Sequence, residues 1–294
     1  MQEIRKIKRK NLDVEKYSKA LNDSLNYRIY AEVWYLDVLT DGNWECWIYG
    51  DYEVIMPVPF QLKFGIKFII MPIYCQQLGV FYKEEIPDEL FQKFERKIYK
   101  SLVRSYAFNE ENTERFQPRG EKRVNYILDL NRPYEEIFEN YTKHRRKDIR
   151  KSEKLGVQVV ESNNYEKFLD LRLRFYKHLD KYADYEFLQK HLRFLIEKKA
   201  LILCEVRDKD GICIAVQYFI KSKNRILCMG FVRDKINENH NSSAYVNDFM
   251  IKNFAETSLI YDLRGSMIEE VAYFMKGFGV EKKFYTVFSR QFFR

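Results

Sequence analysis

No stretch of this sequence is apolar for long enough to cross a membrane. A spanning helix needs roughly 18 apolar residues, and the most apolar stretch, 64–74, is interrupted by Lys67 and Pro72. The N-terminus leads from Met1 into Lys and Arg and lacks the apolar segment of a secretory signal peptide. We therefore expect a cytoplasmic protein with no membrane span.

Metal and redox motifs are also missing. The four histidines are scattered, and the cysteines contain no C-x-x-C pair, so neither a zinc site nor a redox pair is indicated. We expect no metal cofactor and free, buried thiols in a reducing compartment. The five cysteines are Cys46, Cys75, Cys204, Cys213 and Cys228.

Motifs for phosphate-loop, dinucleotide and hydrolase chemistry are absent too. The sequence contains no G-x-x-x-x-G-K-[ST], no G-x-G-x-x-G, no H-E-x-x-H and no G-x-S-x-G. These absences set aside P-loop nucleotide hydrolysis, zinc peptidase chemistry and serine hydrolysis.

What the sequence does have is a folded-protein composition and a local excess of positive charge. Its 294 residues are 46% hydrophobic and 32% charged, which favours about two folded domains. The net charge is +8, and residues 143–154 alone hold seven Lys or Arg against Asp148 and Glu153. Such a cluster is either a solvated helix face or a surface that meets an anion, and both interpretations stay open.

The second half of the chain shows an alternating α/β pattern. Apolar residues from Tyr134 to Tyr141 have helical spacing, and they predict one helix that runs through the basic cluster and ends at Gly156. Beyond it the pattern is β-α-α-β-β-β-α-β-α-β, a mixed-sheet α/β arrangement. The predicted strands are 157–160, 200–207, 212–221, 225–233, 259–263 and 284–288, and the predicted helices are 164–179, 187–196, 244–257 and 267–276.

The first half gives a less regular pattern of the same kind. The expected helices are 14–25 and 87–102, and the expected strands are 29–39, 44–49, 53–60 and 124–130. Two hairpins, 44–56 and 203–214, are alike in sequence. A duplicated domain is therefore expected, with domains at 1–132 and 133–294.

Candidate site residues lie where strands end and helices begin. Ser242 and Ser243 precede the predicted 244–257 helix, where they can cap it or offer amide groups to a phosphate. Asp262 ends a predicted strand, where it can bind a substrate amine or hold a loop. Arg146 and Arg150 are four residues apart, so both can reach one phosphate.

These motifs resemble a known family. The segment 143–157 is similar to the R-x-x-I-(R/K)-K-(A/S)-x-K-x-G-(V/L) segment of FemABX-type transferases. Residues 261–266 and 274–279 resemble that family's D-F-x-G and F-K-x-G-F-G signatures. The element order of 157–288 resembles the GNAT acyltransferase fold, and residues 76–79 resemble related two-domain GNAT-like proteins.

The resemblance implies an α/β protein of tandem GNAT-like domains that transfers an acyl group to an amine. GNAT enzymes use acyl-CoA, whereas FemABX members transfer an amino acid from aminoacyl-tRNA to a peptidoglycan precursor. On this hypothesis Arg146 and Arg150 bind donor phosphates, and Ser242 and Ser243 bind the donor through their amides. Asp262 would orient the acceptor amine.

Tyr285 completes the hypothesis as the acid that protonates the leaving group. The sequence departs from the family at two places: Met275 stands where the signature has lysine, and the loop 237–244 has no glycine. These departures leave an alternative open, in which the chain is a catalytically degenerate GNAT-like module that binds RNA or an anionic envelope precursor.

Overall fold

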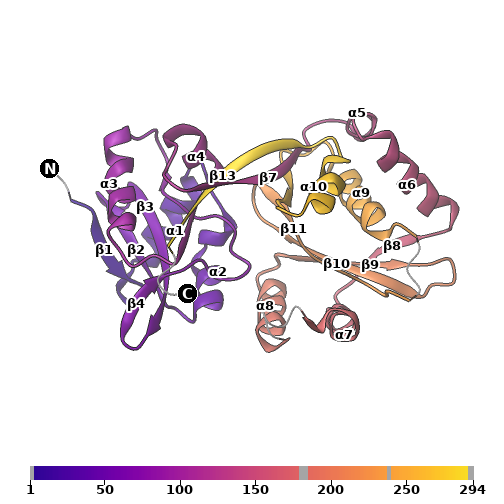
Figure 1. The fold of residues 1–294 in the computed structure, drawn as a ribbon, viewed down its shortest axis with the longest axis horizontal. Coiled ribbons are helices and arrows are strands. Elements are labelled where there is room, and N and C mark those ends of the chain that lie inside the picture. The colour runs from indigo at the N-terminus through magenta and orange to yellow at the C-terminus, as the bar shows by residue number, and fades with distance from the viewer. Residues whose placement is uncertain (1–2, 179–184, 237–239, 291–294) are drawn as a thin grey trace. The chain divides into compact units, whose positions relative to one another are not determined.

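The chain divides into two compact units in the computed structural model, which describes residues 3–178, 185–236 and 240–290 (Figure 1). Unit 1 comprises Met1–Arg123 and Lys283–Arg294, and unit 2 comprises Val124–Lys282. The domain boundary expected after residue 132 differs from this division. Residues 124–129 group with unit 2 because strand β7 (Glu121–Asp129) pairs there with β12 (Ile260–Arg264).

Unit 1 is built on a sheet with the strand order β1-β2-β3-β4, with β5 paired to β3. The chain also returns to this unit at its end, where β13 pairs antiparallel with β6. The elements of unit 1 are β1 (Arg5–Lys8), α1 (Val14–Asp23), α2 (Val33–Thr40), β2 (Trp44–Tyr49), β3 (Val54–Lys63), β4 (Ile66–Ile69), β5 (Phe81–Tyr82), α3 (Asp88–Tyr99), β6 (Ser105–Phe108), α4 (Glu110–Phe116) and β13 (Glu281–Ser289).

Unit 2 has a mixed sheet in the order β7-β12-β11-β10-β9-β8. Strands β9, β10 and β11 form the predicted antiparallel meander, and β11 and β12 run parallel. The other elements of unit 2 are α5 (Tyr134–Glu139), α6 (Lys143–Lys154), β8 (Gln158–Glu161), α7 (Glu166–Phe175), α8 (Tyr185–Glu197), β9 (Leu201–Arg207), β10 (Cys213–Lys221), β11 (Arg225–Arg233), α9 (Ser242–Phe254) and α10 (Glu269–Lys276).

Helices cover both faces of the unit 2 sheet. Helices α7 and α8 lie on one face, and α5, α6, α9 and α10 lie on the other (Figure 1). A hydrophobic core lies beneath α9 and includes Ile149, Phe219, Ile251 and Phe278. The element order predicted for 157–288 is confirmed in full.

Three sequence expectations are wrong. Residues 29–39 were expected to be a strand, but they form a 3-10 turn (Ile29–Ala31) followed by α2. The single helix expected over 134–154 is two helices, because Thr142 caps a new helix by accepting a hydrogen bond from the Arg145 amide. Ser242 and Ser243 are not caps, since α9 begins at Ser242 and its N-cap is Asn241.

The cysteines are free thiols, as expected. Four of them are buried and Cys213 is half-buried. Burial raises the pKa of the Cys204 thiol to about 12 and that of Cys213 to about 11. These thiols are therefore protonated and unreactive near neutral pH.

Candidate functional site

Helix α6 presents its cations to solvent because it is anchored on one side by Arg145. Arg145 is buried, and its guanidinium donates to the Asp148 carboxylate (3.1 Å) and to the Phe274 carbonyl (2.9 Å). The same group stacks over the rings of Phe274 and Phe278, 4.1 and 4.7 Å from their centroids. Burial lowers the pKa of Arg145. The helix is thereby fixed to the α10 segment.

Further contacts attach α6 to the start of α9. The buried Ser152 hydroxyl donates to the His240 carbonyl, and Asn241 donates to the Asp148 carboxylate (3.2 Å). Ile149 enters the core between them. The other Lys and Arg side chains of α6 lie on the faces that do not pack against α9 and α10. Two pockets border those faces.

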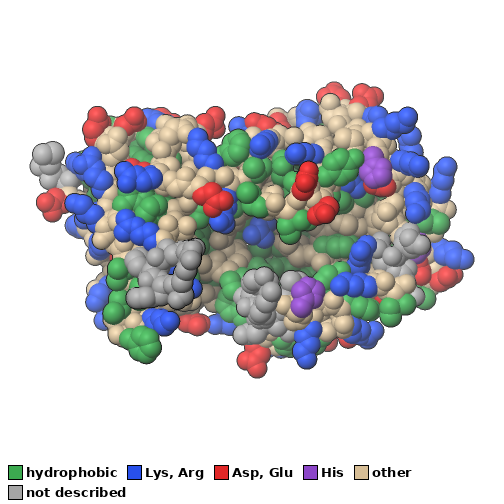
Figure 2. Space-filling view, viewed as in Figure 1, with side chains coloured by type: hydrophobic (Ala, Val, Ile, Leu, Met, Phe, Trp, Pro, Cys, Tyr) green, Lys and Arg blue, Asp and Glu red, His purple; other side chains and the backbone are tan. Residues whose placement is uncertain are grey.

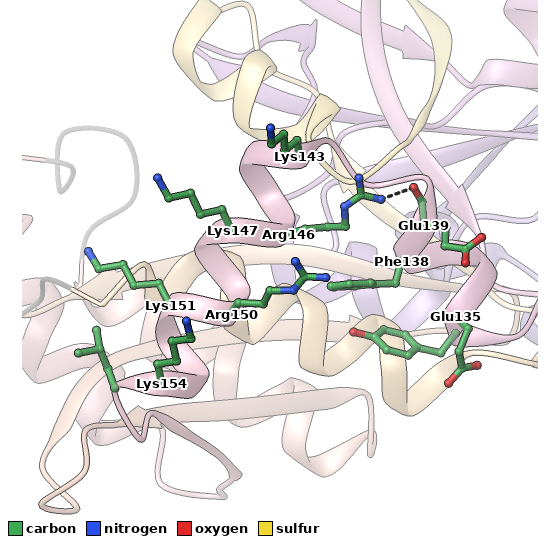
Figure 3. A pocket seen from close by; sticks show the side chains of 11 residues that line it. Glu135, Phe138, Glu139, Lys143, Arg146, Lys147, Arg150, Lys151 and Lys154 are labelled. Carbon is green, nitrogen blue, oxygen red and sulfur yellow. Dashed lines mark hydrogen bonds between the residues drawn. The ribbon is translucent and has the colours of Figure 1, made fainter.

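The first pocket, here called the α5–α6 groove, has a volume of about 950 Å³. In Figure 3, Arg146 and Arg150 point toward α5, whereas Lys147 and Lys151 point away from it. Arg146 donates to the Glu139 carbonyl (2.7 Å). The groove is lined by Tyr134, Glu135, Phe138, Glu139, Lys143, Arg146, Lys147, Arg150, Lys151, Lys154 and Leu155.

The second pocket, here called the α9 pocket, has a volume of about 580 Å³ and lies on the other flank of α6. It joins cations of α6 and β11 to the N-terminus of α9 and to aromatic residues of α10. Its lining residues are His144, Arg145, Lys147, Asp148, Lys151, Arg233, Asn241, Ser243, Ala244, Tyr273 and Phe274.

The α9 pocket has the electrostatics of an anion site. The first turn of α9 contains no acidic residue, and within the described part of the chain the Ser243 amide has no hydrogen-bond partner. Lys147 and Lys151 form no ion pair with any described residue. Unpaired helix amides and the positive end of the helix dipole favour a bound anion.

The predicted phosphate site is divided between these two pockets. Arg146 and Arg150 share one face, as expected, but they line the α5–α6 groove. Ser243 lines the α9 pocket, and Ser242 is fully buried. Neither of the two pockets is therefore lined by all four residues. Lys147 and Lys151, which border both pockets, were not singled out from the sequence.

Asp262 does not line either pocket, and its carboxylate is buried. One oxygen accepts from Arg225 (2.8 Å), and the other accepts from Asn125 (3.0 Å) and from the Arg264 amide (2.8 Å). Asn125 lies on β7 and Arg225 on β11, so Asp262 joins the strands on both sides of β12. The basic helix and Asp262 therefore do not share either of these two pockets.

Tyr285 lies in unit 1, where its nearly buried side chain packs with Ala107 and Val287. It is not among the described residues that line the two pockets. Met275 is half-buried and packs against the core of unit 2, while Lys276 is exposed. Part of the glycine-free loop, 237–239, lies outside the described residues.

Sequence reasoning missed His144. Its Nε2 lies 3.5 Å from the Asp148 carboxylate, and the largely exposed imidazole lines the α9 pocket. The i, i+4 spacing of His144 and Asp148 within the basic helix was the signal that could have found it.

A buried acid lies behind the α5–α6 groove. Burial raises the pKa of the Asp248 carboxyl to about 6, although the Tyr134 hydroxyl, which donates to it at 2.9 Å, partly offsets this. Burial also raises the pKa of Tyr134 above its ordinary value. The Asp248 carboxyl is therefore expected to lose its proton near pH 6.

The described part of the chain shows neither a metal-binding cluster nor a membrane-spanning helix. No group of three or more His, Cys, Asp or Glu that could hold a metal is found among residues 3–178, 185–236 and 240–290. In the same part of the chain, each helix is too short or too polar to cross a bilayer.

The fold matches solved structures over nearly the whole chain. FemX superposes with a TM-score of 0.70 at 11% identity, covering 97% of this chain and 98% of that one. The chain has a FemX-like fold. L-PGS from Bacillus licheniformis gives a TM-score of 0.57 at 10% identity, covering 96% and 93% of the two chains.

The resemblance to GNAT proteins is seen as well. A GNAT-family acetyltransferase from Colwellia psychrerythraea gives a TM-score of 0.54 at 12% identity, covering 97% of this chain and 98% of that one. No family model matches the sequence, and no curated protein matches it. The predicted fold class, mixed-sheet α/β of the FemABX-like GNAT type, is confirmed, and the likeness is one of fold.

Proposed function

We propose that this protein is an N-acyltransferase that moves an acyl or aminoacyl group from an anionic donor to an amine. The observation that carries the proposal is the α9 pocket, where Lys147 and Lys151 meet the amide end of α9. The FemX-like fold supports a transferase, since solved structures with this fold include a GNAT-family acetyltransferase.

The donor would be acyl-CoA or aminoacyl-tRNA, because both carry phosphates that suit this pocket. The Ser243 amide would donate to a phosphate oxygen, while Lys147 and Lys151 balance its charge. Tyr273 and Phe274 offer apolar surface for the rest of the donor. The acceptor would be a primary amine, which in the FemABX-type hypothesis belongs to a peptidoglycan precursor.

The chemistry needs little from the protein beyond placement. The amine nitrogen attacks the acyl carbonyl, a C–N bond forms, and the C–S or C–O bond to the donor breaks. Holding both reactants in one pocket can supply about 7–11 kcal/mol of the barrier. His144 would accept the proton that the amine loses, since histidine is the usual proton acceptor near neutral pH.

The leaving thiolate or alkoxide would take up the proton that His144 accepted from the amine, which balances the transfer. Tyr285, the acid of the sequence hypothesis, is not among the described residues that line the α9 pocket and has no role in this step. Met275 stands where the family signature has lysine, so oxyanion stabilisation by that lysine is not part of this proposal.

Ligand-induced thermal shift tests the donor. Acetyl-CoA, longer acyl-CoAs and charged tRNA are added separately, and a ligand at 100 times its Kd stabilises the protein by about 2.7 kcal/mol. Two double variants on α6 give a matched pair. Lys147→Gln with Lys151→Gln should abolish the shift, whereas Lys143→Gln with Lys154→Gln should retain it, because the second pair lines only the α5–α6 groove.

Turnover of a primary amine then tests the reaction. His144→Gln should lower kcat while leaving the donor-induced thermal shift unchanged. If no donor shifts the melting temperature, or if both double variants lose the shift equally, the proposed donor site is wrong.

A second candidate is a non-catalytic module that binds RNA or an anionic envelope precursor. Two observations favour it. Met275 stands where the family signature has lysine, and the α5–α6 groove is lined by Arg150 and Lys154, which form no ion pair with any described residue. Replacing Arg146 and Arg150 by Ala should reduce the salt dependence of binding by about two phosphate contacts. An unchanged salt slope would exclude the groove as the binding surface, and turnover would favour the enzyme.

A further inference from the structure

The tip of the β3–β4 hairpin exposes an unusual amount of apolar surface. Phe64 is 93% exposed, Leu62 is 62% exposed and Ile66 is 49% exposed. In Figure 2 hydrophobic side chains gather at the end of the hairpin that Figure 1 labels β4, with Lys or Arg beside them. Single exposed apolar residues are ordinary, but three within five residues at a projecting tip mark an interaction site.

The backbone of the turn makes Phe64 more unusual. Lys63 pairs with Ile66, so Phe64 and Gly65 form a two-residue turn, and their φ values are 52° and 74°. A turn with positive φ at both central residues favours Asn-Gly. A bulky aromatic residue is costly in this conformation. Because the Phe64 ring makes little contact with the fold, folding does not explain its presence.

The side chains around the tip suit a lipid surface better than a protein groove. Leu62 lies opposite Lys67 on one face of the hairpin, and Ile66 lies opposite Lys63 on the other. Each face thus carries one aliphatic side chain and one lysine. A protein groove would cover one face, whereas lipid would surround the inserted tip on both sides.

The charge of the tip specifies the kind of lipid. Residues 61–68 contain Lys63 and Lys67 and no acidic residue. Lys67 forms an ion pair with Glu45, but Lys63 is exposed and forms no ion pair with a described residue. Lysines beside inserted apolar side chains attract anionic headgroups, and each contributes to membrane affinity.

We propose that the β3–β4 hairpin tip inserts Phe64, with Leu62 and Ile66, into the headgroup boundary of an anionic lipid bilayer. Lys63 lies at the depth of the lipid phosphates, and the rest of unit 1 stays in water. This attachment is independent of the transferase proposal, because it requires neither the α9 pocket nor the α5–α6 groove.

Vesicle cosedimentation of the full chain tests the inference. One vesicle is pure phosphatidylcholine, and the other contains equal parts of phosphatidylcholine and phosphatidylglycerol. The protein should bind the anionic vesicle, and Phe64→Asn should weaken binding about tenfold. Lys63→Gln should weaken it about fivefold. Ile212→Asn, which alters a 60% exposed aliphatic residue in the β9–β10 turn, is the matched control and should bind normally.

Loss of stability would not explain weaker vesicle binding by Phe64→Asn. Asn tolerates the left-handed conformation better than Phe, so Phe64→Asn should keep or raise the melting temperature. Equal vesicle binding by Phe64→Asn and the wild type would overturn the inference. So would absence of vesicle binding together with a concentration-dependent dimer that Phe64→Asn abolishes, because the tip would then bind a second copy of the chain.

Discussion

Substitution of the buried pair Asp262 and Arg225 can distinguish a structural role for Asp262 from the catalytic role that the sequence suggested. Their side chains are 2% and 4% exposed, and the contact between them is 2.8 Å. Asp262→Asn keeps the size of the side chain and removes its charge, so the Arg225 guanidinium loses its counter-charge in the interior. Breaking such a pair costs about 3–5 kcal/mol. We expect Asp262→Asn to lose about 3 kcal/mol of the free energy of unfolding.

A second substitution should restore part of this stability. In the double variant Arg225→Met with Asp262→Asn, the buried charge is gone, and the amide oxygen of residue 262 can still accept from Asn125 and the Arg264 amide. Replacing a buried ion pair by groups of similar volume is often close to neutral. The double variant should therefore recover more than half of the loss.

The assay must report on unit 2. All three tryptophans, Trp34, Trp44 and Trp47, lie in unit 1, so tryptophan fluorescence monitors that unit. Urea unfolding is therefore followed by far-UV circular dichroism, with hydrogen exchange of residues 124–282 as the local measurement.

The surface pair Arg174–Asp170 provides the control. Its side chains are largely exposed, and Asp170→Asn should change stability by less than about 1 kcal/mol. If Asp262→Asn unfolds like the wild type but loses turnover, Asp262 acts on substrate and the structural interpretation is wrong.

Three further predictions concern unit 2. The folded chain retains the Asp248 proton up to about pH 6, whereas an unfolded Asp releases its proton near pH 4. The free energy of unfolding should therefore fall by about 3 kcal/mol from pH 4 to 6, and Asp248→Asn should abolish this fall in urea titrations. Arg145→Lys loses the fork that holds the Phe274 carbonyl and should lower the melting temperature by several degrees in calorimetry. Gly265→Ala would place a Cβ against the Val124 carbonyl oxygen and should sharply reduce the folded yield.

The second half of the fold could be predicted from the sequence because each of its elements carries its own pattern. The meander β9-β10-β11 has short polar turns, and α9 and α10 have clear helical spacing. Residues 29–39 lack such a pattern. Helix α2 buries Val33, Tyr35, Leu36, Val38 and Leu39, so it is apolar on most sides and has no periodicity that distinguishes it from a strand.

The candidate site could be predicted only in part. Spacing along α6 places Arg146 and Arg150 on one face, and this is confirmed by the α5–α6 groove. Successive helical residues are about 100° apart, so Lys147 and Lys151 turn toward the opposite flank. Which flank borders α9 depends on Arg145, Ile149 and Ser152 packing inward, and this is a tertiary contact that no local pattern contains.

The D-L-R-G motif at 262–265 is explained by backbone geometry. Asp262 accepts a hydrogen bond from the Arg264 amide while Arg264 adopts a left-handed conformation, and Gly265 then passes close to the Val124 carbonyl. These features end β12. Its parallel pairing with β11 covers only three residue pairs, from Arg225↔Ile260 to Leu227↔Asp262.

Beyond that point β11 continues without β12 to Arg233, which lines the α9 pocket. The second motif contributes in a similar way, since the Phe274 and Phe278 rings hold Arg145, and a side chain on Gly277 would press on the Arg145 guanidinium. Both motifs therefore support the α9 pocket without lining it through a catalytic group. The motif at 262–265 ends the pairing of β12 with β11 beside the pocket, and the motif at 274–279 fixes helix α6, whose lysines border the pocket. Residues that resemble a catalytic signature can thus belong to the support of a site, and the groups that meet the ligand must be found from the pocket itself.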